Sequence, residues 1–462
     1  MHWIKEWLCG PAGAGALLLT GVLLSLRLRF VQIRQLPQAL RSIFACNRDA
    51  CGCGAISPMQ SVCTALAGTM GTGNIAGVAG AIALGGPGAV GWMWLAAFFG
   101  MATKYAEVAL AVRCRRKNAQ GEWVGGPMYV IETVLGKKAR PLAKAFCVCG
   151  VLASLGMGNA AQVNTLCGSL CTLVQTYGGR MDVSVLRLAA GGVLAVITAL
   201  MVLGGMRRIA CAAERIMPFV SIVYVLCMLA VIAAHAGRII PVLGMIFRAM
   251  LSPQAALGGA AGITLKTAIG TGVTRGIFTN EAGMGSSAIA HAAAHGAEPH
   301  TQGLWGIFEV FADTFVMCTL TALGILTSGC EIPYGQAAGA EVTMQAIATV
   351  FGGRMSALLI TLCMACFALS TLLAWSYYGM RCMEYLWKGR GVRGYLWMFS
   401  LLTAPFAVMD AAQMWEMAEV FTVMMALCNI PVLCLSTFPW MKMEKKTDKH
   451  IAKRGFAGYT GE

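Results

Sequence analysis

Apolar residues run along this chain in long stretches that polar residues seldom interrupt. An α-helix needs about 20 consecutive apolar residues to cross the hydrocarbon core of a bilayer. Eleven such stretches occur, and the pattern therefore predicts an all-α integral membrane protein with 11 transmembrane helices. The predicted spans are residues 11–30, 59–84, 89–112, 143–174, 186–203, 217–235, 258–290, 301–327, 345–380, 395–408 and 417–437.

Two of these spans carry a glycine-rich, polar segment in their interior. The segment at 68–77 reads GTMGTGNIAG, and the segment at 270–285 reads GTGVTRGIFTNEAGMG. If the first span is an extra helix and the other ten divide five plus five, each segment lies in the first helix of its half. Because five is odd, the second half is upside down relative to the first, and the pattern predicts an inverted repeat.

Glycine and polar residues at matched positions of an inverted repeat indicate a ligand site. Lipid does not tolerate unpaired backbone groups, so a helix unwinds only where a ligand or another protein group takes them. We therefore expect the first and sixth core helices to be broken at these segments. The alternative is that the glycines merely let helices pack closely, and for either segment alone the two explanations are equally good.

The spans divide the chain into four parts. Residues 1–58 hold the extra helix and a basic loop, 59–257 the first five-helix repeat, 258–437 the second repeat, and 438–462 a polar tail. Every segment outside the spans is short, the longest being the 30 residues at 113–142. A membrane enzyme or receptor with a soluble catalytic or sensor domain is therefore disfavoured.

Composition supports the membrane assignment. The 462-residue chain is 58% hydrophobic and 12% charged, with a mean hydropathy of +0.69, whereas about 25% of the residues of a soluble domain are charged. A net charge of +15 would suit a nucleic-acid-binding protein if the chain were soluble, but here Lys and Arg gather at helix ends, so we expect no nucleic-acid partner. The 19 cysteines are scattered through apolar stretches and are interpreted as small hydrophobic residues.

The basic loops predict the orientation of the chain. Lys and Arg are frequent at 27–48, 113–117, 137–144, 207–215, 381–393 and in the tail. The opposite loops at 328–345 and 408–417 contain neither residue. Because cytoplasmic loops are enriched in Lys and Arg, we expect a multi-pass protein of the inner (plasma) membrane with its N-terminus outside and its C-terminus in the cytoplasm.

One basic residue, Arg275, lies inside the second glycine-rich segment. A charge at membrane depth needs a partner and is often functional. Glu281, Glu309 and Asp313 are the candidates for that partner. We favour a structural or gating ion pair, and a proton-coupled mechanism would instead require one of these carboxylates to titrate.

Three histidines, His291, His295 and His300, follow the second glycine-rich segment. They resemble a metal-binding cluster only loosely and are interpreted as loop histidines. The sequence shows no nucleophile–base pair, Walker loop or haem-attachment spacing. We therefore expect a protein that is not an enzyme and that uses no cofactor.

Six longer motifs resemble the alanine or glycine:cation symporter family, also called the sodium:alanine symporters. They are GTGNIAGVA at 71–79, GGPGA at 85–89, GGPMY at 125–129, RGIFTNEAGMGSS at 275–287, WGIFEVFADT at 305–314 and STLLAWSYYG at 370–379. The similarity covers nearly the whole chain. It implies a LeuT-like inverted-repeat fold, sodium as a co-substrate, and a small neutral amino acid as the substrate.

The resemblance also implies a substrate site at the two breaks. Backbone N–H groups of Thr72, Gly73 and Asn74 would hold the substrate carboxylate, and the Asn74 side chain would offer its carbonyl to the substrate amine or to a cation, with a helix cap as its alternative role. Small residues in the sixth core helix suit a substrate that carries a methyl group or none. The residues expected to line that break are Thr271, Thr274, Gly276, Ile277 and Thr279.

Two further helices are expected to contribute. Family similarity places Gln162 in the substrate site, and Trp375 is expected to cap the pocket unless it packs against lipid. In LeuT-like proteins an adjacent hydroxyl pair completes a sodium site with helix-one carbonyls, although most such hydroxyls bond to their own helix. The residues implied for sodium are Ala67, Met70, Ser370 and Thr371.

Together these features predict a sodium-coupled symporter that imports alanine or glycine by alternating access. A proton-coupled or exchange-only carrier of the same fold for another small solute is the main alternative, and a channel is another. The sequence does not distinguish alanine from glycine, serine or D-isomers, and it does not indicate an oligomeric state.

Overall fold

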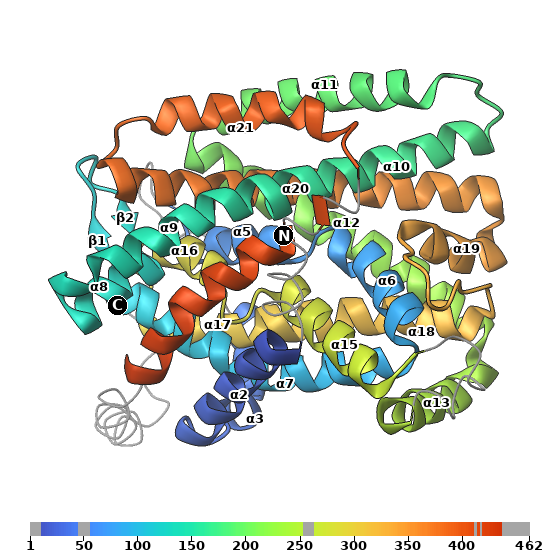
Figure 1. Ribbon diagram of the computed structural model, residues 1–462, viewed down its shortest axis with the longest axis horizontal. Helices are drawn as coiled ribbons and strands as arrows, with labels where there is room; N and C mark the ends of the chain where they lie inside the picture. Colours follow the sequence, from blue (N-terminus) through green and yellow to red (C-terminus); the bar gives the residue numbers. More distant parts are fainter. Residues whose placement is uncertain (1–10, 45–55, 253–262, 411–413, 416–417, 437–462) are drawn as a thin grey trace.

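The computed structural model describes residues 11–44, 56–252, 263–410, 414–415 and 418–436 (Figure 1). Nearly all of these residues are helical. The two short strands β1 (Arg116–Lys117) and β2 (Trp123–Val124) pair antiparallel at one end of the molecule. The predicted tail at 438–462 lies outside the described residues.

Seven helices in the described part of the chain are long and apolar enough to cross a membrane. Five of them are α7 (Gly88–Arg113), α11 (Val183–Val202), α12 (Met206–Ala234), α20 (Gly353–Trp387) and the helix Ala418–Ser436. The sixth, Lys137–Thr176, consists of η2 (Lys137–Ala139), α9 (Arg140–Leu155), the π-helical η3 (Gly156–Ala160) and α10 (Ala161–Thr176). The seventh, Pro299–Ser328, consists of α17 (Pro299–Val310), the π-helical η5 (Phe311–Cys318) and α18 (Thr319–Ser328). The all-α membrane class is thereby confirmed, while the count of 11 spans stays a prediction.

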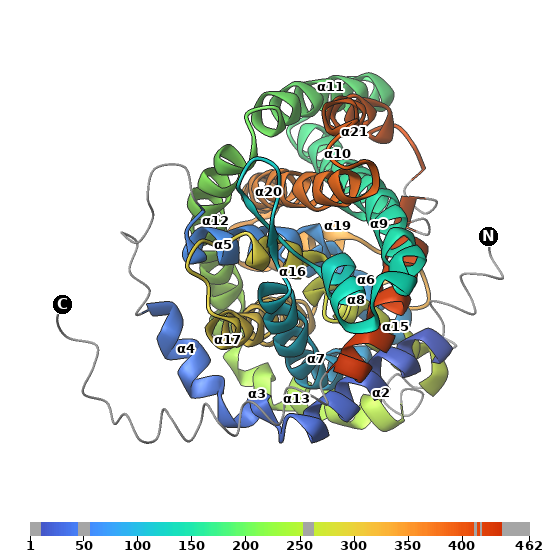
Figure 2. The same cartoon turned by 90° about the vertical axis from the view of Figure 1, so that its left-hand side faces the viewer.

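Shorter helices complete the structure. They are α2 (Pro11–Arg27), α3 (Val31–Arg34), α4 (Leu36–Phe44), α5 (Pro58–Thr69), η1 (Thr72–Asn74), α6 (Ala76–Gly85), α8 (Pro127–Leu135), η4 (Ala236–Arg238), α13 (Ile239–Leu251), α15 (Leu265–Asn280), α16 (Ser286–Ala292), α19 (Ala340–Phe351) and α21 (Val392–Phe406). Viewed along the helices, α5, α16 and α20 lie near the middle, and α11 and α21 form an outer pair (Figure 2).

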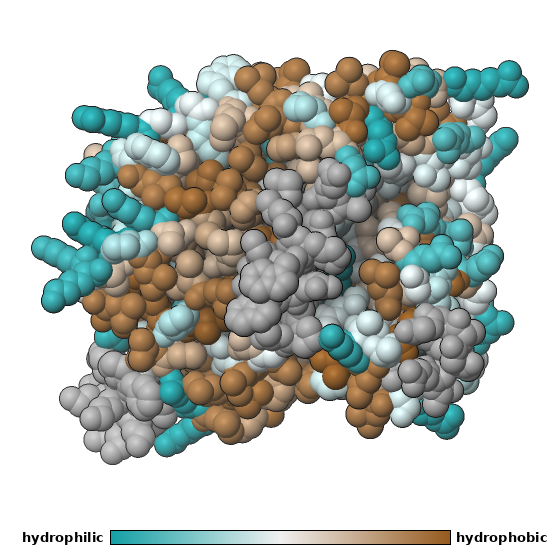
Figure 3. Space-filling model, viewed as in Figure 1, coloured by the Kyte–Doolittle hydropathy of each residue, from teal (hydrophilic) through white to brown (hydrophobic). Residues whose placement is uncertain are grey.

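Hydrophobic and hydrophilic residues are distributed over the surface as expected for a protein embedded in a bilayer. Hydrophobic residues are frequent along the upper and lower edges of the face in Figure 3 and to the left of its centre, and hydrophilic residues gather at its left and right ends. The outer helix α11 exposes large apolar side chains such as Leu188, Val196 and Leu200, which are 54%, 60% and 63% exposed. These side chains are positioned to contact lipid, because the helix has no protein neighbour on that side to bury them.

The end of the molecule that carries β1 and β2 is fixed by ion pairs. Arg381 lies 2.8 Å from Glu122 and 2.6 Å from Glu384. Partial burial alone would raise the pKa of Glu122, but the ion pair with Arg381 and a hydrogen bond from Asn118 hold that pKa below its ordinary value. The basic loops thus contain acidic partners that tie β1 and β2 to the end of α20.

The first glycine-rich segment separates two helices. α5 begins with a capping box, in which Ser57 and Gln60 each accept from the other's backbone N–H. It ends at Thr69, where Met70 leaves the helical conformation with φ −78° and ψ 91°. The three residues of η1 follow, and α6 starts at Ala76.

The second glycine-rich segment interrupts its helix only at its C-terminal end. α15 runs without interruption from Leu265 to Asn280, so the break predicted within 270–285 does not lie at the glycines 270, 272 and 276. The chain leaves the helix only afterwards, at Glu281, Gly283 and Gly285, which have φ values of 54°, 88° and 86°.

Close packing against α7 explains why the glycines lie inside a continuous helix. A Cβ atom added to Gly272 would lie 2.4 Å from the Ala89 carbonyl oxygen, and one added to Gly276 would lie 3.1 Å from Met93 Cα. These glycines let two helix backbones approach, which is the alternative role that the sequence left open. The left-handed conformation at three positions of 281–285 ends the helix instead.

Gly272→Ala is expected to lower the free energy of unfolding by about 1–3 kcal/mol, because the added methyl group overpacks a backbone contact. Gly270→Ala is the matched control, since no atom lies within 4 Å of an added Cβ there. Thermal unfolding of the purified variants measures the difference. Equal stability of the two variants would show that the α7–α15 contact tolerates a methyl group.

Other span boundaries also differ from the prediction. The span predicted at 345–380 joins two helices, α19 and α20, which Gly352 separates with a left-handed φ of 76°. The short helix α13 was not predicted. The predicted beginnings of the spans at 258 and 417 lie outside the described residues.

Candidate functional site

The segment between α5 and α6 is buried at the centre of the molecule and is held by α10. Oε1 of Gln162 accepts hydrogen bonds from the backbone N–H of Thr72 at 3.2 Å and from its hydroxyl at 2.9 Å. Gln162 Nε2 donates to the Met157 carbonyl across the π-helical η3. The structure thus brings together two residues that the sequence placed in one site, 90 positions apart.

Asn74 connects the same segment to η5. Its Oδ1 accepts from the Gly71 N–H at 3.0 Å, which caps η1. Its Nδ2 donates to Asp313 Oδ1 at 2.7 Å. The cap role considered for Asn74 is therefore present, and the same side chain also holds a buried carboxylate.

Asp313 has further partners on η5 and α15. Its Oδ2 accepts from the Thr314 hydroxyl at 2.9 Å, and Asn280 Nδ2 donates to that hydroxyl at 3.2 Å. Thr279 lies beside η1, because a Cβ added to Gly73 would lie 3.3 Å from the Thr279 methyl group. The C-terminal end of α15 therefore faces the segment between α5 and α6.

The other α15 residues predicted for the substrate site lie elsewhere. Gly276 packs against Met93 of α7, and Thr271 lies 3.2 Å from the position of a Cβ on Gly85. Thr274 and Ile277 line a small cavity between α15, α2 and the helix Ala418–Ser436. The remaining residues that line it are Ala14, Leu17, Phe278, Met284, Glu419, Thr422, Val423 and Ala426.

The expected sodium ligands on α20 behave differently from each other. The Thr371 hydroxyl donates to the Ala67 carbonyl of α5 at 2.9 Å. The Ser370 hydroxyl donates to Phe367 of its own helix. A Cβ on Gly71 would lie 2.7 Å from the Thr371 hydroxyl oxygen, so α20 also touches the interrupted segment. Sodium binding at these residues and at Met70 stays a prediction.

Trp375 is fully buried, so the lipid-facing alternative was wrong. Its Nε1 donates to Glu281 Oε1 at 3.0 Å, in the connection between α15 and α16. Gly158 of η3 packs against it so closely that an added Cβ would lie 2.2 Å from the Trp375 Cβ. Trp375 thus connects η3 to the true interruption after α15.

The partner of Arg275 is not among the three carboxylates proposed from the sequence. Arg275 lies 3.0 Å from Glu419 of the helix Ala418–Ser436 and packs over the Trp415 ring at 5.0 Å. This pair joins α15 to the last described helix. The Arg275 side chain is 18% exposed and the Glu419 side chain 9%. The pair lies at the side of the molecule where α2 also packs against α15.

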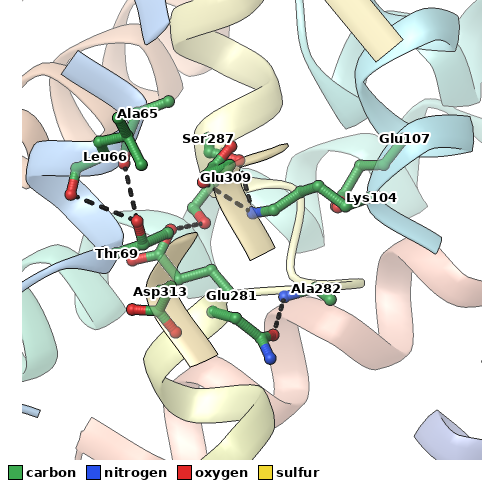
Figure 4. Close-up of polar contacts among 12 residues, drawn as sticks. Ala65, Leu66, Thr69, Lys104, Glu107, Glu281, Ala282, Ser287, Glu309 and Asp313 are labelled. Atoms are coloured by element: carbon green, nitrogen blue, oxygen red, sulfur yellow. Dashed lines mark hydrogen bonds and ion pairs between the residues drawn. The ribbon is translucent and has the colours of Figure 1, made fainter. Parts of the chain in front are cut away.

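The interpretation of His291 as a loop histidine was also wrong. His291 belongs to α16 and is fully buried. It lies next to an ion pair between Lys104 of α7 and Glu309 of α17, whose nitrogen and oxygen are 3.1 Å apart (Figure 4). The sequence identified the carboxylate but missed Lys104, because a single Lys inside an apolar helix gives no sign of its partner.

A second missed residue is Glu107, one turn after Lys104. Its carboxylate accepts from the Gly283 N–H at 3.2 Å and from Asn429 at 2.8 Å. It therefore supports the connection between α15 and α16 from α7, as Trp375 does from α20. No group of three or more His, Cys, Asp or Glu in the described part of the chain is arranged to hold a metal ion.

Chemically, the site offers backbone N–H groups, carbonyls, hydroxyls and one carboxylate around an interrupted helix. Such groups can bind a zwitterion and a small cation, since a carboxylate accepts from N–H donors and hard cations take oxygen ligands.

Comparison with known proteins agrees with the motifs. A sequence profile described as the sodium:alanine symporter family matches residues 1–454. A Haemophilus influenzae protein named "Uncharacterized transporter" is 42% identical over 416 residues, covering 90% of this chain and 88% of its own. The sodium/alanine symporter AgcS of Methanococcus maripaludis is 40% identical over 439 residues, covering 94% of each chain.

The fold also has a counterpart among solved structures. MhsT in complex with L-phenylalanine superposes with a TM-score of 0.58 at 14% identity, covering 81% of this chain and 88% of that one. At that identity the similarity concerns the fold alone. The family resemblance drawn from the six motifs is confirmed, and the chain belongs to the sodium:alanine symporter family of membrane transporters.

Proposed function

We propose that this transporter carries a small neutral amino acid, alanine or glycine, into the cell together with sodium. The observation that carries the proposal is the interrupted segment from Met70 to Ile75. Three other helices contact it, through Gln162 at Thr72, Asp313 at Asn74 and Thr371 at Gly71. Alternating access would expose this segment first to one side of the membrane and then to the other.

The substrate carboxylate would bind at the start of η1. The N–H groups of Gly71 and Thr72 donate to the side-chain oxygens of Asn74 and Gln162. A carboxylate that replaces one of these oxygens would accept the same hydrogens, with Asp313 near enough to Asn74 to face the ammonium group. Gly71, Gly73 and the Thr279 methyl group leave little room, which favours a small side chain.

Sodium would bind between α5 and α20, at the carbonyls of Ala67 and Met70 and the hydroxyls of Ser370 and Thr371. Thr371 already points at the Ala67 carbonyl, and Ser370 would have to turn away from Phe367 to join it. One positive charge that moves through 100 mV contributes about 2.3 kcal/mol, so a single sodium ion would suffice for roughly fiftyfold accumulation from voltage alone.

The basic loops indicate how the protein is oriented in the membrane. We place the end with β1 and β2 in the cytoplasm, the N-terminus outside and the C-terminus inside, because the basic loops gather there.

A proton-coupled or exchange-only carrier of the same fold is the second candidate. It is favoured by Asp313, whose carboxylate is fully buried and forms no ion pair with a Lys, Arg or His in the described residues.

Thr371→Val is expected to raise the half-saturating sodium concentration for alanine uptake by about tenfold or more, because it removes one ligand oxygen worth about 1.5–3 kcal/mol. The maximal rate at saturating sodium should change little. Uptake by proteoliposomes at a series of sodium concentrations measures the shift.

Ser376→Ala is the matched control, since the Ser376 hydroxyl is buried in the same helix and donates to Leu373 of that helix. Its sodium dependence should equal that of the wild type. An unchanged sodium dependence in Thr371→Val would rule out the proposed sodium site.

A further inference from the structure

A second buried polar cluster lies where α16 meets α7 and α17, apart from the proposed substrate and sodium sites. Lys104 Nζ lies 3.1 Å from Glu309 Oε1 and 2.7 Å from the Ser287 hydroxyl (Figure 4). His291 lies between Glu309 and Gln302. All five side chains are at most 1% exposed, and the proposed transport reaction assigns no role to any of them.

The orientation of the Gln302 side-chain amide determines which ring nitrogen of His291 carries a hydrogen. Gln302 Nε2 lies 3.5 Å from the Ser61 hydroxyl, which already donates to the Pro58 carbonyl at 2.7 Å and so accepts from the amide. Gln302 Oε1 therefore faces His291 Nδ1, at 2.8 Å. Because an amide oxygen can only accept, Nδ1 carries a hydrogen.

The other ring nitrogen of His291 faces a carboxylate. Nε2 lies 3.2 Å from Glu309 Oε2. If the ring were neutral and Glu309 ionised, two acceptors would face each other in a buried site, which is unfavourable. We infer that His291 and Glu309 form a proton-binding site in which one additional proton lies between the ring and the carboxylate.

The surrounding charges favour retention of this proton. Lys104 is the one Lys or Arg side chain in the described structure that pairs with Glu309. The other titratable groups that face Glu309 are Glu107 of α7, Glu281 of the α15–α16 connection, Asp313 of η5 and Tyr378 of α20. Because carboxylates outnumber cations here, a proton reduces the uncompensated negative charge in a medium that screens charge poorly.

The proton site is complete only while His291 of α16 lies next to Glu309 of α17. α16 supplies His291 and α17 supplies Glu309, and Gln302 extends the chain of hydrogen bonds to Ser61 of α5. α5 and α16 contact each other and lie near the end that carries β1 and β2, where Arg115 donates to the Ala294 carbonyl just after α16.

Separation of α16 from α17 would leave the His291 ring without the Glu309 carboxylate and weaken proton binding. The packed arrangement therefore binds one proton more than the separated one, and by linkage acid pH favours the packed arrangement. If the transport cycle proposed above opens this end, opening releases that proton, and this consequence rests on the proposed function.

Nitrogen NMR of the full-length protein in nanodiscs, labelled with ¹⁵N at histidine, tests the site without any need for transport. The chain has six histidines, and His291→Gln identifies the relevant signals. The expected result near neutral pH is a His291 ring with both nitrogens protonated, or a neutral ring together with a protonated carboxyl band in the infrared spectrum that Glu309→Gln removes. A neutral ring without such a band would overturn the inference.

The control and the functional test use variants of the same kind. In the control variant His235→Gln, the substituted ring is one that bonds to the Val231 carbonyl of its own helix, so the His291 signals should stay in place.

Wild-type uptake at saturating sodium and alanine should fall by about tenfold per pH unit on the acid side, and His291→Gln should abolish that slope. A wild-type slope in His291→Gln, or in Glu309→Gln if the first variant does not fold, would overturn the link between proton binding and opening.

Discussion

Asn74→Ala is expected to reduce sodium-driven alanine uptake by about ten- to a hundredfold, because a hydrogen bond to a buried charge contributes about 1.5–3 kcal/mol. The Asn74 side chain accepts from the Gly71 N–H at 3.0 Å and donates to Asp313 at 2.7 Å. Alanine removes both contacts at once, so the interrupted segment loses its cap and the carboxylate loses a donor. Initial rates of radiolabelled alanine uptake by proteoliposomes measure the effect.

Asn164→Ala is the matched control for this experiment. Asn164 is also buried and lies two residues after Gln162 in α10. It donates to the Met409 and Phe406 carbonyls rather than to η1. Its uptake should stay within severalfold of the wild type. Normal uptake in Asn74→Ala would remove Asn74 from the site, and an equal loss in both variants would show only that buried amides are needed for folding.

Lys104→Met is expected to lower the free energy of unfolding by about 3–5 kcal/mol, because it leaves the buried carboxylate of Glu309 without its ammonium partner. Both side chains of this pair are fully buried. Thermal or detergent-induced unfolding of the purified protein measures the loss, and it requires no assumption about transport.

Arg140→Met provides the comparison for Lys104→Met. Arg140 lies 2.9 Å from Glu132, but its side chain is 57% exposed, and exposed pairs contribute about 0–1 kcal/mol. An equally small loss of unfolding free energy in both variants would mean that the Lys104–Glu309 ion pair does not stabilise the fold more than an exposed pair does.

The long spans could be predicted closely from the sequence, because a continuous apolar run between charged loops leaves little choice. Residues 89–112 were predicted for the helix that the structure gives as Gly88–Arg113. The split between α19 and α20 was missed because the apolar run continues through it, and Gly352 ends the first helix by its backbone conformation alone. Short helices such as α13 fall below the length of a bilayer crossing, so the same criterion passed over them.

The two glycine-rich segments show how far local sequence can be interpreted. Glycine serves both close packing and unwinding, and only the neighbouring helix decides between them. At 71–74 the neighbours are polar side chains, and the chain leaves the α-helix. At 272 and 276 the neighbour is the backbone of α7, and the helix continues to Asn280.

Contacts between distant residues account for what the sequence could not provide. Gln162 and Thr371 were named from the family resemblance, and the structure places both against the interrupted segment. The pairing of Arg275 with Glu419 joins residues far apart in the chain and was assigned to the wrong carboxylates. Side-chain pairing of this kind depends on how helices are arranged, and no local pattern records that arrangement.

We propose that sodium and a small amino acid cross the membrane together through a site at the interrupted helix. The most direct measurement is alanine uptake into proteoliposomes after a sudden increase of external sodium, with the membrane potential clamped and the pH equal on both sides. We expect concentrative alanine uptake that requires the sodium gradient and that glycine inhibits by competition. Uptake that is unaffected by sodium, or that follows a pH gradient alone, would contradict it.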